Sequence, residues 1–340
     1  MTLKMISLIC SLQDDAGINI RDRLLEINDW SKIDPPTSEK MTEALKLYPA
    51  THSEIYPDET YPNILTEIYE FKKNDVLFRL FTLDGRLLFQ DEIDKRLSFM
   101  GFESDLIVFL SKHKSKSEMK SLTVHPTGNC LEALYGGYPH ELNVPAPLEM
   151  KKLLLHMDRQ KNNVPEYDVT FEVTHHGPTR LSVPSLFIEI GSAEPEWRDK
   201  AAGFVLARAV LSLADSEKDS DDDRNLKEKE LQTDQIVAVS FGGSHYGERQ
   251  TVNIFRTRIA FGHMFPKYQL ETLTEDVILQ AFEKTGTKTA FFDKKSMKSE
   301  SRRFLTELLE RNGCRILTDK EVKEEYGVGF NLRKSKADDD

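Results

Sequence analysis

The chain has 340 residues and a formal net charge of −11. This length suffices for one large α/β domain or two smaller lobes, so stability need not depend on metal ions or disulfides. The acidic balance argues against a general nucleic-acid coat protein, because phosphate binding depends on clustered Lys and Arg, although it leaves room for a local basic patch.

The cysteines and the N-terminal segment indicate the compartment. Cys10, Cys130 and Cys314 lie far apart and have no CxxC spacing, which is typical of a reducing environment. The first residues lack the apolar core of a signal peptide, and no apolar run approaches the roughly 18 residues of a membrane span. We therefore expect a cytoplasmic protein with no membrane partner.

Apolar runs typical of strands alternate along the chain with helical patterns. Strands are predicted at 4–10, 75–82, 105–110, 122–125, 167–174, 186–190, 235–241 and 289–292. Helices are predicted at 147–160, 195–214, 275–284 and 299–312, with a short one near 41–47 in the proline-rich stretch 34–62. This alternation predicts an α/β fold with a mostly parallel, doubly wound sheet.

The chain is expected to form a single catalytic unit over residues 1–331, built as one α/β domain or as two α/β lobes. Residues 215–232 are rich in acids and serine and predict a mobile insertion. Residues 332–340 predict a disordered tail.

Two adjacent histidines end the predicted strand at 167–174, in which Val169, Phe171 and Val173 form one apolar face. In a straight strand His175 and His176 point to opposite faces and could not bind one ion. The Gly177-Pro178 turn that follows bends the chain and can bring either ring into a crevice. The alternative is one satisfied core histidine and one solvated histidine.

Three further histidines, His113, His125 and His245, also lie at or just past the ends of predicted strands. In an open parallel sheet such ends converge on one crevice. Neutral imidazoles gathered there suit zinc or acid–base chemistry near neutral pH. The alternative is chance placement, since polar residues collect in loops.

A carboxylate interrupts the apolar run LFIEIG at Glu189. Its burial without a partner would be costly. The partner could be a metal ion, a histidine of the crevice, or a structural arginine such as Arg180 or Arg208.

A glycine-rich loop follows the strand at 235–241. Gly242 and Gly243 permit close backbone approach to a ligand, although the loop matches no phosphate-binding motif. Tyr246 could stack on a base and Arg249 could meet a phosphate, while a tight turn is the plain alternative.

Two basic runs remain. Lys112 and Lys114 flank His113 and are candidates for phosphate contact. The second run is interpreted as a solvated face, as most such runs are, and comprises Lys294, Lys295, Lys298, Arg302 and Arg303.

Four segments in this order, SLTVHPTGN, VTHHGPT, PSLFIEIGS and GGSHY, resemble the D-aminoacyl-tRNA deacylase family of archaeal and plant type. The resemblance implies hydrolysis of the ester between a D-amino acid and the terminal ribose of its tRNA. It also implies about two zinc ions per chain. It further implies a monomer, no DNA partner, and an α/β fold similar to peptidyl-tRNA hydrolases and nucleoside phosphorylases.

The resulting hypothesis is zinc-assisted ester hydrolysis of D-aminoacyl-tRNA. In it, His113 or His125 moves protons. The expected metal ligands are drawn from His175, His176, Glu189 and His245. The expected tRNA or substrate contacts are Lys112, Lys114, Gly242, Gly243, Tyr246 and Arg249. The alternatives are a metal-dependent hydrolase or phosphorylase of a nucleoside or small amide, and a non-catalytic tRNA-binding module.

Overall fold

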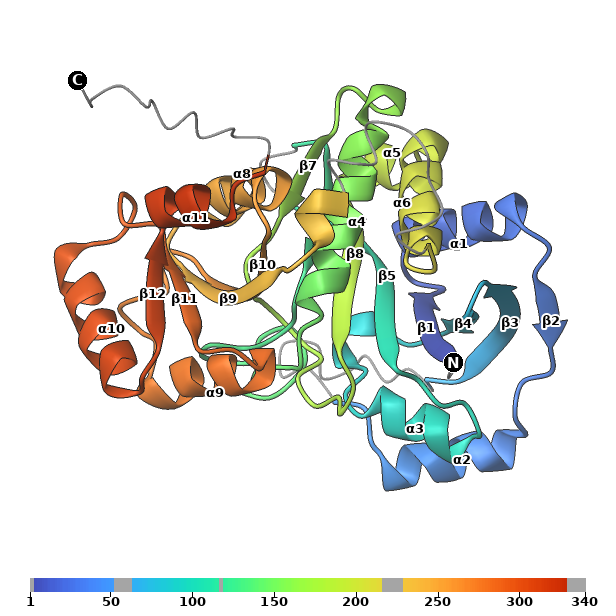
Figure 1. The fold of residues 1–340 in the computed structure, drawn as a ribbon. Helices are drawn as coiled ribbons and strands as arrows, with labels where there is room; N and C mark the ends of the chain where they lie inside the picture. Colours follow the sequence, from blue (N-terminus) through green and yellow to red (C-terminus); the bar gives the residue numbers. More distant parts are fainter. Residues whose placement is uncertain (1–2, 52–62, 116–118, 216–228, 329–340) are drawn as a thin grey trace, which may run out of the picture.

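The computed structural model describes residues 3–51, 63–115, 119–215 and 229–328, which form two sheets (Figure 1). The large sheet has the strand order β2-β3-β4-β1-β5-β8-β6-β7, and the small sheet has the order β10-β9-β11-β12. The mixed α/β class with a mostly parallel sheet, predicted from the alternating pattern, is confirmed.

The strands of the large sheet are β1 (Lys4–Ser11), β2 (Ser31–Ile33), β3 (Leu65–Lys73), β4 (Val76–Leu83), β5 (Leu106–Lys114), β6 (Ser121–His125), β7 (Asp168–Phe171) and β8 (Ser185–Ser192). Those of the small sheet are β9 (Ile236–Phe241), β10 (Ile259–Phe265), β11 (Thr289–Phe292) and β12 (Arg315–Thr318). The α-helices are α1 (Asp15–Ile27), α2 (Ser38–Leu47), α3 (Ile93–Phe99), α4 (Pro147–Arg159), α5 (Glu194–Trp197), α6 (Lys200–Ser212), α8 (Glu248–Arg256), α9 (Glu275–Thr285), α10 (Ser299–Arg311) and α11 (Asp319–Tyr326).

Strand direction differs between the two halves of the large sheet. Strands β4, β1, β5 and β8 are parallel, but β6 and β7 run antiparallel to β8. The expectation that the histidine-bearing strands all end at one edge of a parallel sheet is therefore wrong for the β6–β7 pair. In the small sheet all four strands are parallel.

Helices cover both faces of the large sheet. Helices α1, α4 and α6 pack on one face, where Ile188 and Ile190 of β8 join the main apolar core. Helices α2 and α3 pack on the other face against Phe109 and Phe187. Because α2 and α3 are short, they cover only part of that second face (Figure 1).

Helix α4 joins the two sheets, since it contacts β6 and β7 on one side and β10 on the other (Figure 1). Its buried Lys151 ammonium donates hydrogen bonds to the carbonyl oxygens of Thr257 and Ile259, at 2.7 and 2.9 Å. These carbonyls lie at the start of β10, so the link fixes the helix to the small sheet.

A capping carboxylate ties α1 to β5. Asp14 accepts hydrogen bonds from the Gly17 amide at 2.8 Å, and from the Ser111 hydroxyl and Lys112 amide at 3.0 Å. Burial raises the pKa of the Asp14 carboxyl to about 6, although the three hydrogen-bond donors act in the opposite direction and lower it. The carboxylate fixes the β1–α1 turn beside the end of β5, which carries His113.

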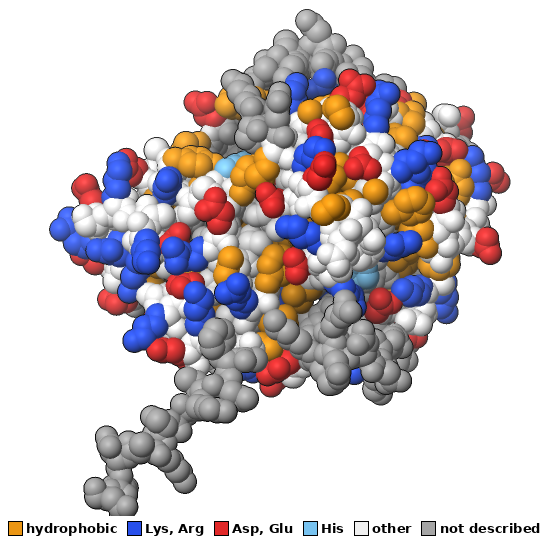
Figure 2. Space-filling model, turned by 90° about the horizontal axis from the view of Figure 1, so that it is seen from above, with side chains coloured by type: hydrophobic (Ala, Val, Ile, Leu, Met, Phe, Trp, Pro, Cys, Tyr) orange, Lys and Arg blue, Asp and Glu red, His pale blue; other side chains and the backbone are white. Residues whose placement is uncertain are grey.

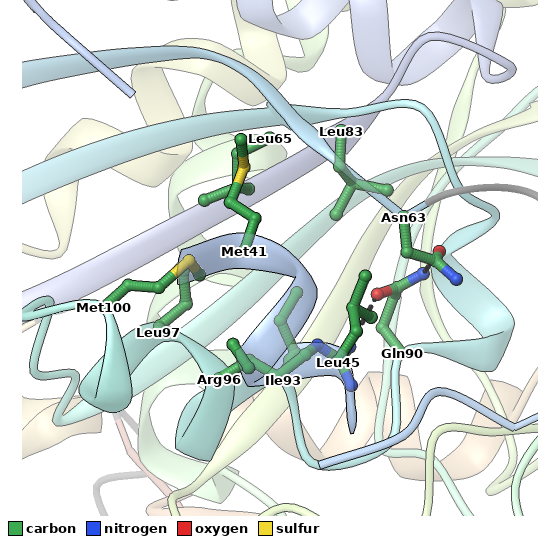
Figure 3. A pocket seen from close by; sticks show the side chains of 11 residues that line it. Met41, Leu45, Asn63, Leu65, Leu83, Gln90, Ile93, Arg96, Leu97 and Met100 are labelled. Carbon is green, nitrogen blue, oxygen red and sulfur yellow. Dashed lines mark hydrogen bonds between the residues drawn. The ribbon is translucent and has the colours of Figure 1, made fainter. Parts of the chain in front are cut away.

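A small cavity lies between α2, α3 and the adjoining strands (Figure 3). Its volume is about 20 Å³, and Met41, Leu65, Leu83 and Met100 supply much of its lining. The Gln90 amide donates to the Asn63 side chain at 2.6 Å at its polar end. This space suits a single water molecule rather than a substrate.

Most predicted elements occur within a few residues of their expected bounds, but two differ. The strand expected at 167–174 ends at Phe171, and the helix expected at 195–214 is divided into α5 and α6. Most of the acidic segment 215–232 and the tail 332–340 lie outside the described residues. None of the described helices is both long and apolar enough to cross a membrane.

Candidate active site

The register of three strands places a set of polar side chains on one face of the large sheet. Glu189 of β8 lies opposite Ser111 of β5 and Thr123 of β6. His113 and His125 are each two residues further along these neighbouring strands, so their side chains share the face of Glu189. This is the face that α2 and α3 leave partly uncovered.

The chain after β7 covers this polar face. Glu172 still follows the sheet register, because its amide donates to Val124 of β6 at 3.0 Å. The next two amides, of Val173 and Thr174, instead donate to His245 and Met264, at 3.1 and 2.9 Å. The segment thus leaves the large sheet and binds to the small one.

The turn at the adjacent histidines brings both rings into the site. His176 has a φ of 41°, in the left-handed region, so the pair does not alternate as it would in a strand. The ring centroids of His175 and His176 are 4.4 Å apart, and they lie 4.2 and 4.9 Å from that of His125. Both imidazoles therefore converge on His125.

Backbone carbonyls fix the tautomers of these three histidines. The Nδ1 atoms of His125, His175 and His176 lie 3.2, 2.7 and 2.7 Å from the carbonyl oxygens of Pro126, Val173 and Gly177, respectively. Because a carbonyl oxygen only accepts, each Nδ1 carries a proton, which leaves Nε2 as the nitrogen of each ring that can bind a metal ion. One ligand atom from each of the three lies within 4.8 Å of the others, an arrangement that can hold a metal ion.

A second group surrounds Glu172, whose side chain is fully buried. Its Oε2 atom is 3.4 Å from His113 Nδ1, 3.8 Å from His175 Nε2 and 3.3 Å from His245 Nε2. Neither carboxylate oxygen has a hydrogen-bond partner among the described residues. Glu172, His113 and His245 can also hold a metal ion.

Glu189 lies between the two groups. Its carboxylate is 3.4 Å from His113 Nδ1 and 3.7 Å from His125 Nε2. Of the partners considered from the sequence, it therefore contacts crevice histidines, whereas Arg180 pairs with Glu141.

Burial and the two carboxylates shift the pKa values of the histidines in opposite directions. Burial alone would lower the pKa of His113, but the contact with Glu189 and the charge of Glu172 raise it to about 10. Burial and the neighbouring His125 lower the pKa of His176 to about 3, and that of His175 is lowered for the same reasons. Glu189 also raises the pKa of the buried His125, so the two histidines beside Glu189 favour the charged form and the adjacent pair favours the neutral form.

The structure brings together all six of the predicted catalytic and metal-binding residues. His113, His125, His175, His176, Glu189 and His245 all belong to this cluster. Tyr246 joins it, because its hydroxyl is 2.9 Å from His113 Nε2. Sequence reasoning missed Glu172, which the alternation of Val169, Phe171 and Val173 places on the polar face of a half-buried strand.

Four predicted substrate contacts have other partners. The Lys112 ammonium donates to the Gln13 carbonyl at 3.0 Å and lies 5.1 Å from the Trp197 ring centroid. Arg249 pairs with Asp293 at 2.8 Å. The amides of Gly242 and Gly243 donate to the Phe265 carbonyl and the Ser296 hydroxyl, at 2.8 and 2.7 Å.

The rim of the cluster carries an exposed aromatic residue that the sequence did not single out. The side chain of Tyr268 is 59% exposed, and its hydroxyl lies 3.4 Å from His245 Nδ1. Lys114, the remaining predicted contact, is exposed at the end of β5.

Comparisons with known proteins agree on one family. The family model described as D-aminoacyl-tRNA deacylase matches residues 100–317. A D-aminoacyl-tRNA deacylase of Methanosarcina mazei is 41% identical over 325 residues, which cover 95% of each chain. The Archaeoglobus fulgidus protein of the same name is 36% identical, over 94% of this chain and 98% of its own.

One solved structure has the same fold over nearly the whole chain. It is the crystal structure of a conserved protein of unknown function, 32% identical, with a TM-score of 0.78. The alignment covers 96% of this chain and 99% of that one.

Proposed function

Because the chain belongs to the D-aminoacyl-tRNA deacylase family, we propose that its buried histidine–carboxylate cluster hydrolyses the ester between a D-amino acid and the terminal ribose of tRNA. The observation that carries the assignment to this site is the convergence of five histidines and two carboxylates from both sheets. Buried titratable groups with opposed pKa shifts are typical of catalytic sites.

The cluster fits a zinc cofactor. Three imidazoles that each offer a ligand nitrogen within 4.8 Å of the others form a donor set that zinc prefers, and the orphaned Glu172 oxygens contribute to a second set. In this proposal His125, His175 and His176 hold one ion, and His113, Glu172 and His245 hold another. When bound, zinc polarises the ester carbonyl and lowers the pKa of water.

The protein's own groups orient the substrate and move the proton. His113 is better placed than His125 for this role, because its Nε2 faces the Tyr246 hydroxyl, whereas the His125 side chain is fully buried. A proton on His113 can pass through that hydroxyl to the departing ribose oxygen. The position of His113 on β5 and its contact with the Tyr246 hydroxyl hold the ring in the required orientation.

The test combines metal analysis with a chiral deacylation assay. Purified protein should contain zinc and should release D-tyrosine from D-tyrosyl-tRNA much faster than L-tyrosine from L-tyrosyl-tRNA. Chelation should abolish both zinc content and activity, and added zinc should restore them. Equal hydrolysis of the two substrates would exclude chiral editing.

The variants His175→Ala and His176→Ala assign the activity to the cluster. Each should lose zinc and most activity, because each removes a ligand of the three-histidine group. His156→Gln is the matched control, since His156 of α4 contacts Arg159 and lies outside the cluster. Full zinc content and full activity in both alanine variants would show that this cluster is not the active site.

The compartment and the oligomeric state follow from the proposed substrate and from the family. A tRNA substrate implies action in the cytoplasm. A monomer remains the expectation, which light scattering of the purified protein would test.

A further inference from the structure

The carboxyl ends of three neighbouring strands of the small sheet lie at one edge. The register aligns Phe265 of β10 with Phe241 of β9, and Phe241 with Phe292 of β11. Lys267 and Lys294 each follow two residues after these aligned positions. Because β9 separates their strands, the two lysine backbones emerge about 10 Å apart.

Hydrogen bonds join this edge to the rim of the active site. The Lys267 amide donates to the Gly243 carbonyl at 3.0 Å, and the Gly243 amide donates to the Ser296 hydroxyl at 2.7 Å. Tyr268 is adjacent to Lys267 and contacts His245 of the cluster. A continuous surface therefore runs from the catalytic histidines to the loop after β11.

The basic side chains along this surface form no close ion pair among the described residues, although the charge of Lys294 helps to lower the pKa of Glu321. Lys267, Lys294 and Lys295 are exposed, and none forms an ion pair with any residue in the described part of the chain. Neighbouring cations differ, because Lys298 pairs with Glu271 and Arg249 pairs with Asp293.

Figure 2 shows Lys and Arg side chains gathered across the side of the molecule that the small sheet and α10 occupy. In a chain whose net charge is −11, three exposed lysines that form no ion pair among the described residues mark a surface for a polyanion. We call Lys267, Tyr268, Lys294 and Lys295 the basic edge.

We propose that the basic edge binds the acceptor arm of the tRNA, with Tyr268 stacking on a base of the unpaired 3′ end and the three lysines contacting phosphates. Exposed aromatic rings beside cationic side chains are the usual means of holding single-stranded RNA without reading its sequence. The inference rests on the proposed function, because it assumes that the ester to be cleaved is attached to tRNA. The basic edge thus takes the role of phosphate contact that was predicted for Lys112 and Arg249, because the cationic groups of these two residues have other partners.

Binding of deacylated tRNA tests the lysines without requiring catalysis. The Lys267→Gln/Lys294→Gln/Lys295→Gln variant should bind tRNA about tenfold or more weakly at fixed salt. The slope of log Kd against log salt should fall by about 1 for each phosphate that a lysine no longer neutralises. Lys46→Gln/Lys72→Gln, which neutralises exposed lysines of α2 and β3, is the control and should bind as the wild type does.

Tyr268 is tested with two forms of the same RNA. Tyr268→Ala should weaken binding of intact tRNA by about tenfold, because it removes the ring on which a base stacks. Tyr268→Phe keeps the ring and should bind intact tRNA as the wild type does. With tRNA whose unpaired 3′ nucleotides have been removed, Tyr268→Ala and wild type should bind alike. Weaker binding of both RNA forms by Tyr268→Ala would overturn the stacking role.

Hydrolysis of two substrates separates this inference from the proposed function. The triple lysine variant should lose far more kcat/KM on D-tyrosyl-tRNA than on D-tyrosyl-adenosine. If the wild-type protein binds tRNA through these lysines but cleaves neither ester, the proposed function is wrong while tRNA binding by the basic edge still holds. Equal tRNA affinity of the triple variant and wild type would overturn the basic edge, whatever the activity.

Discussion

Glu172 contacts the imidazoles of three histidines that come from three separate segments of the chain. Its sequence context gave no sign of this, because a charged residue that alternates with Val and Phe reads as the solvated face of a strand. Burial depends on what covers that face, and the covering loop lies more than 60 residues away at His245. Glu189 was predictable because its apolar neighbours on both sides indicate a strand buried on both faces.

The Glu172→Gln variant should bind zinc about tenfold or more weakly, because the amide keeps the size of the carboxylate but lacks its charge. Metal content after dialysis at limiting free zinc measures this effect. The increase in Tm on adding zinc should shrink in parallel.

Glu166→Gln is the control for this prediction, because Glu166 is a well-exposed carboxylate that pairs with Lys120. Undiminished zinc content in Glu172→Gln would show that the buried carboxylate is not a ligand.

The β6–β7 pair, which runs antiparallel to β8, shows what sequence patterns leave open at the scale of elements. Apolar runs predicted most strand positions, but they carry no information about strand direction. The histidines were expected to meet at an edge, whereas His113 and His125 come from oppositely directed strands and meet on a face. Strand direction depends on how distant elements pack together, which a local apolar run does not encode.

The buried Lys151 of α4 predicts a pH dependence of stability. Burial lowers its pKa from 10.5 to about 7 in the folded protein. Between pH 7 and 10.5, Lys151 carries a proton in the unfolded chain but not in the folded protein. The contribution of Lys151 to the free energy of unfolding therefore rises with pH between these two values and is constant below pH 7. Protonation below pH 7 leaves the charge buried between carbonyl oxygens.

Lys151→Met removes this titration while keeping an unbranched side chain. Urea unfolding of both proteins below pH 7 and near pH 10 gives the comparison. The stability of wild type relative to the variant should increase with pH over this interval. A constant difference would show that Lys151 stays charged throughout.

At the scale of the whole molecule, two apolar cores each contain one buried cysteine. Cys10 lies in the core of the large sheet and Cys130 in that of the small sheet, while Cys314 is partly exposed. Burial raises the pKa of both Cys10 and Cys130 to about 12. All three thiols are free, in agreement with the expectation that no disulfide is needed for stability.

Iodoacetamide should therefore modify Cys314 in the native protein and spare the other two. In increasing urea, Cys10 and Cys130 should become reactive together if the two sheets unfold as one unit, which mass spectrometry of labelled peptides can follow. Fast labelling of Cys10 under native conditions would contradict the packing of β1.

The hydrogen bonds from Val173 and Thr174 to His245 and Met264 join segments that leave the ribosome at different times. A ribosome adds about 5–20 residues per second, and His113 and His125 leave it many residues before His245 does. A nascent chain that has folded only its first sheet lacks His245 and holds an incomplete cluster. Under the proposed function, a translation product truncated before His245 would therefore be inactive.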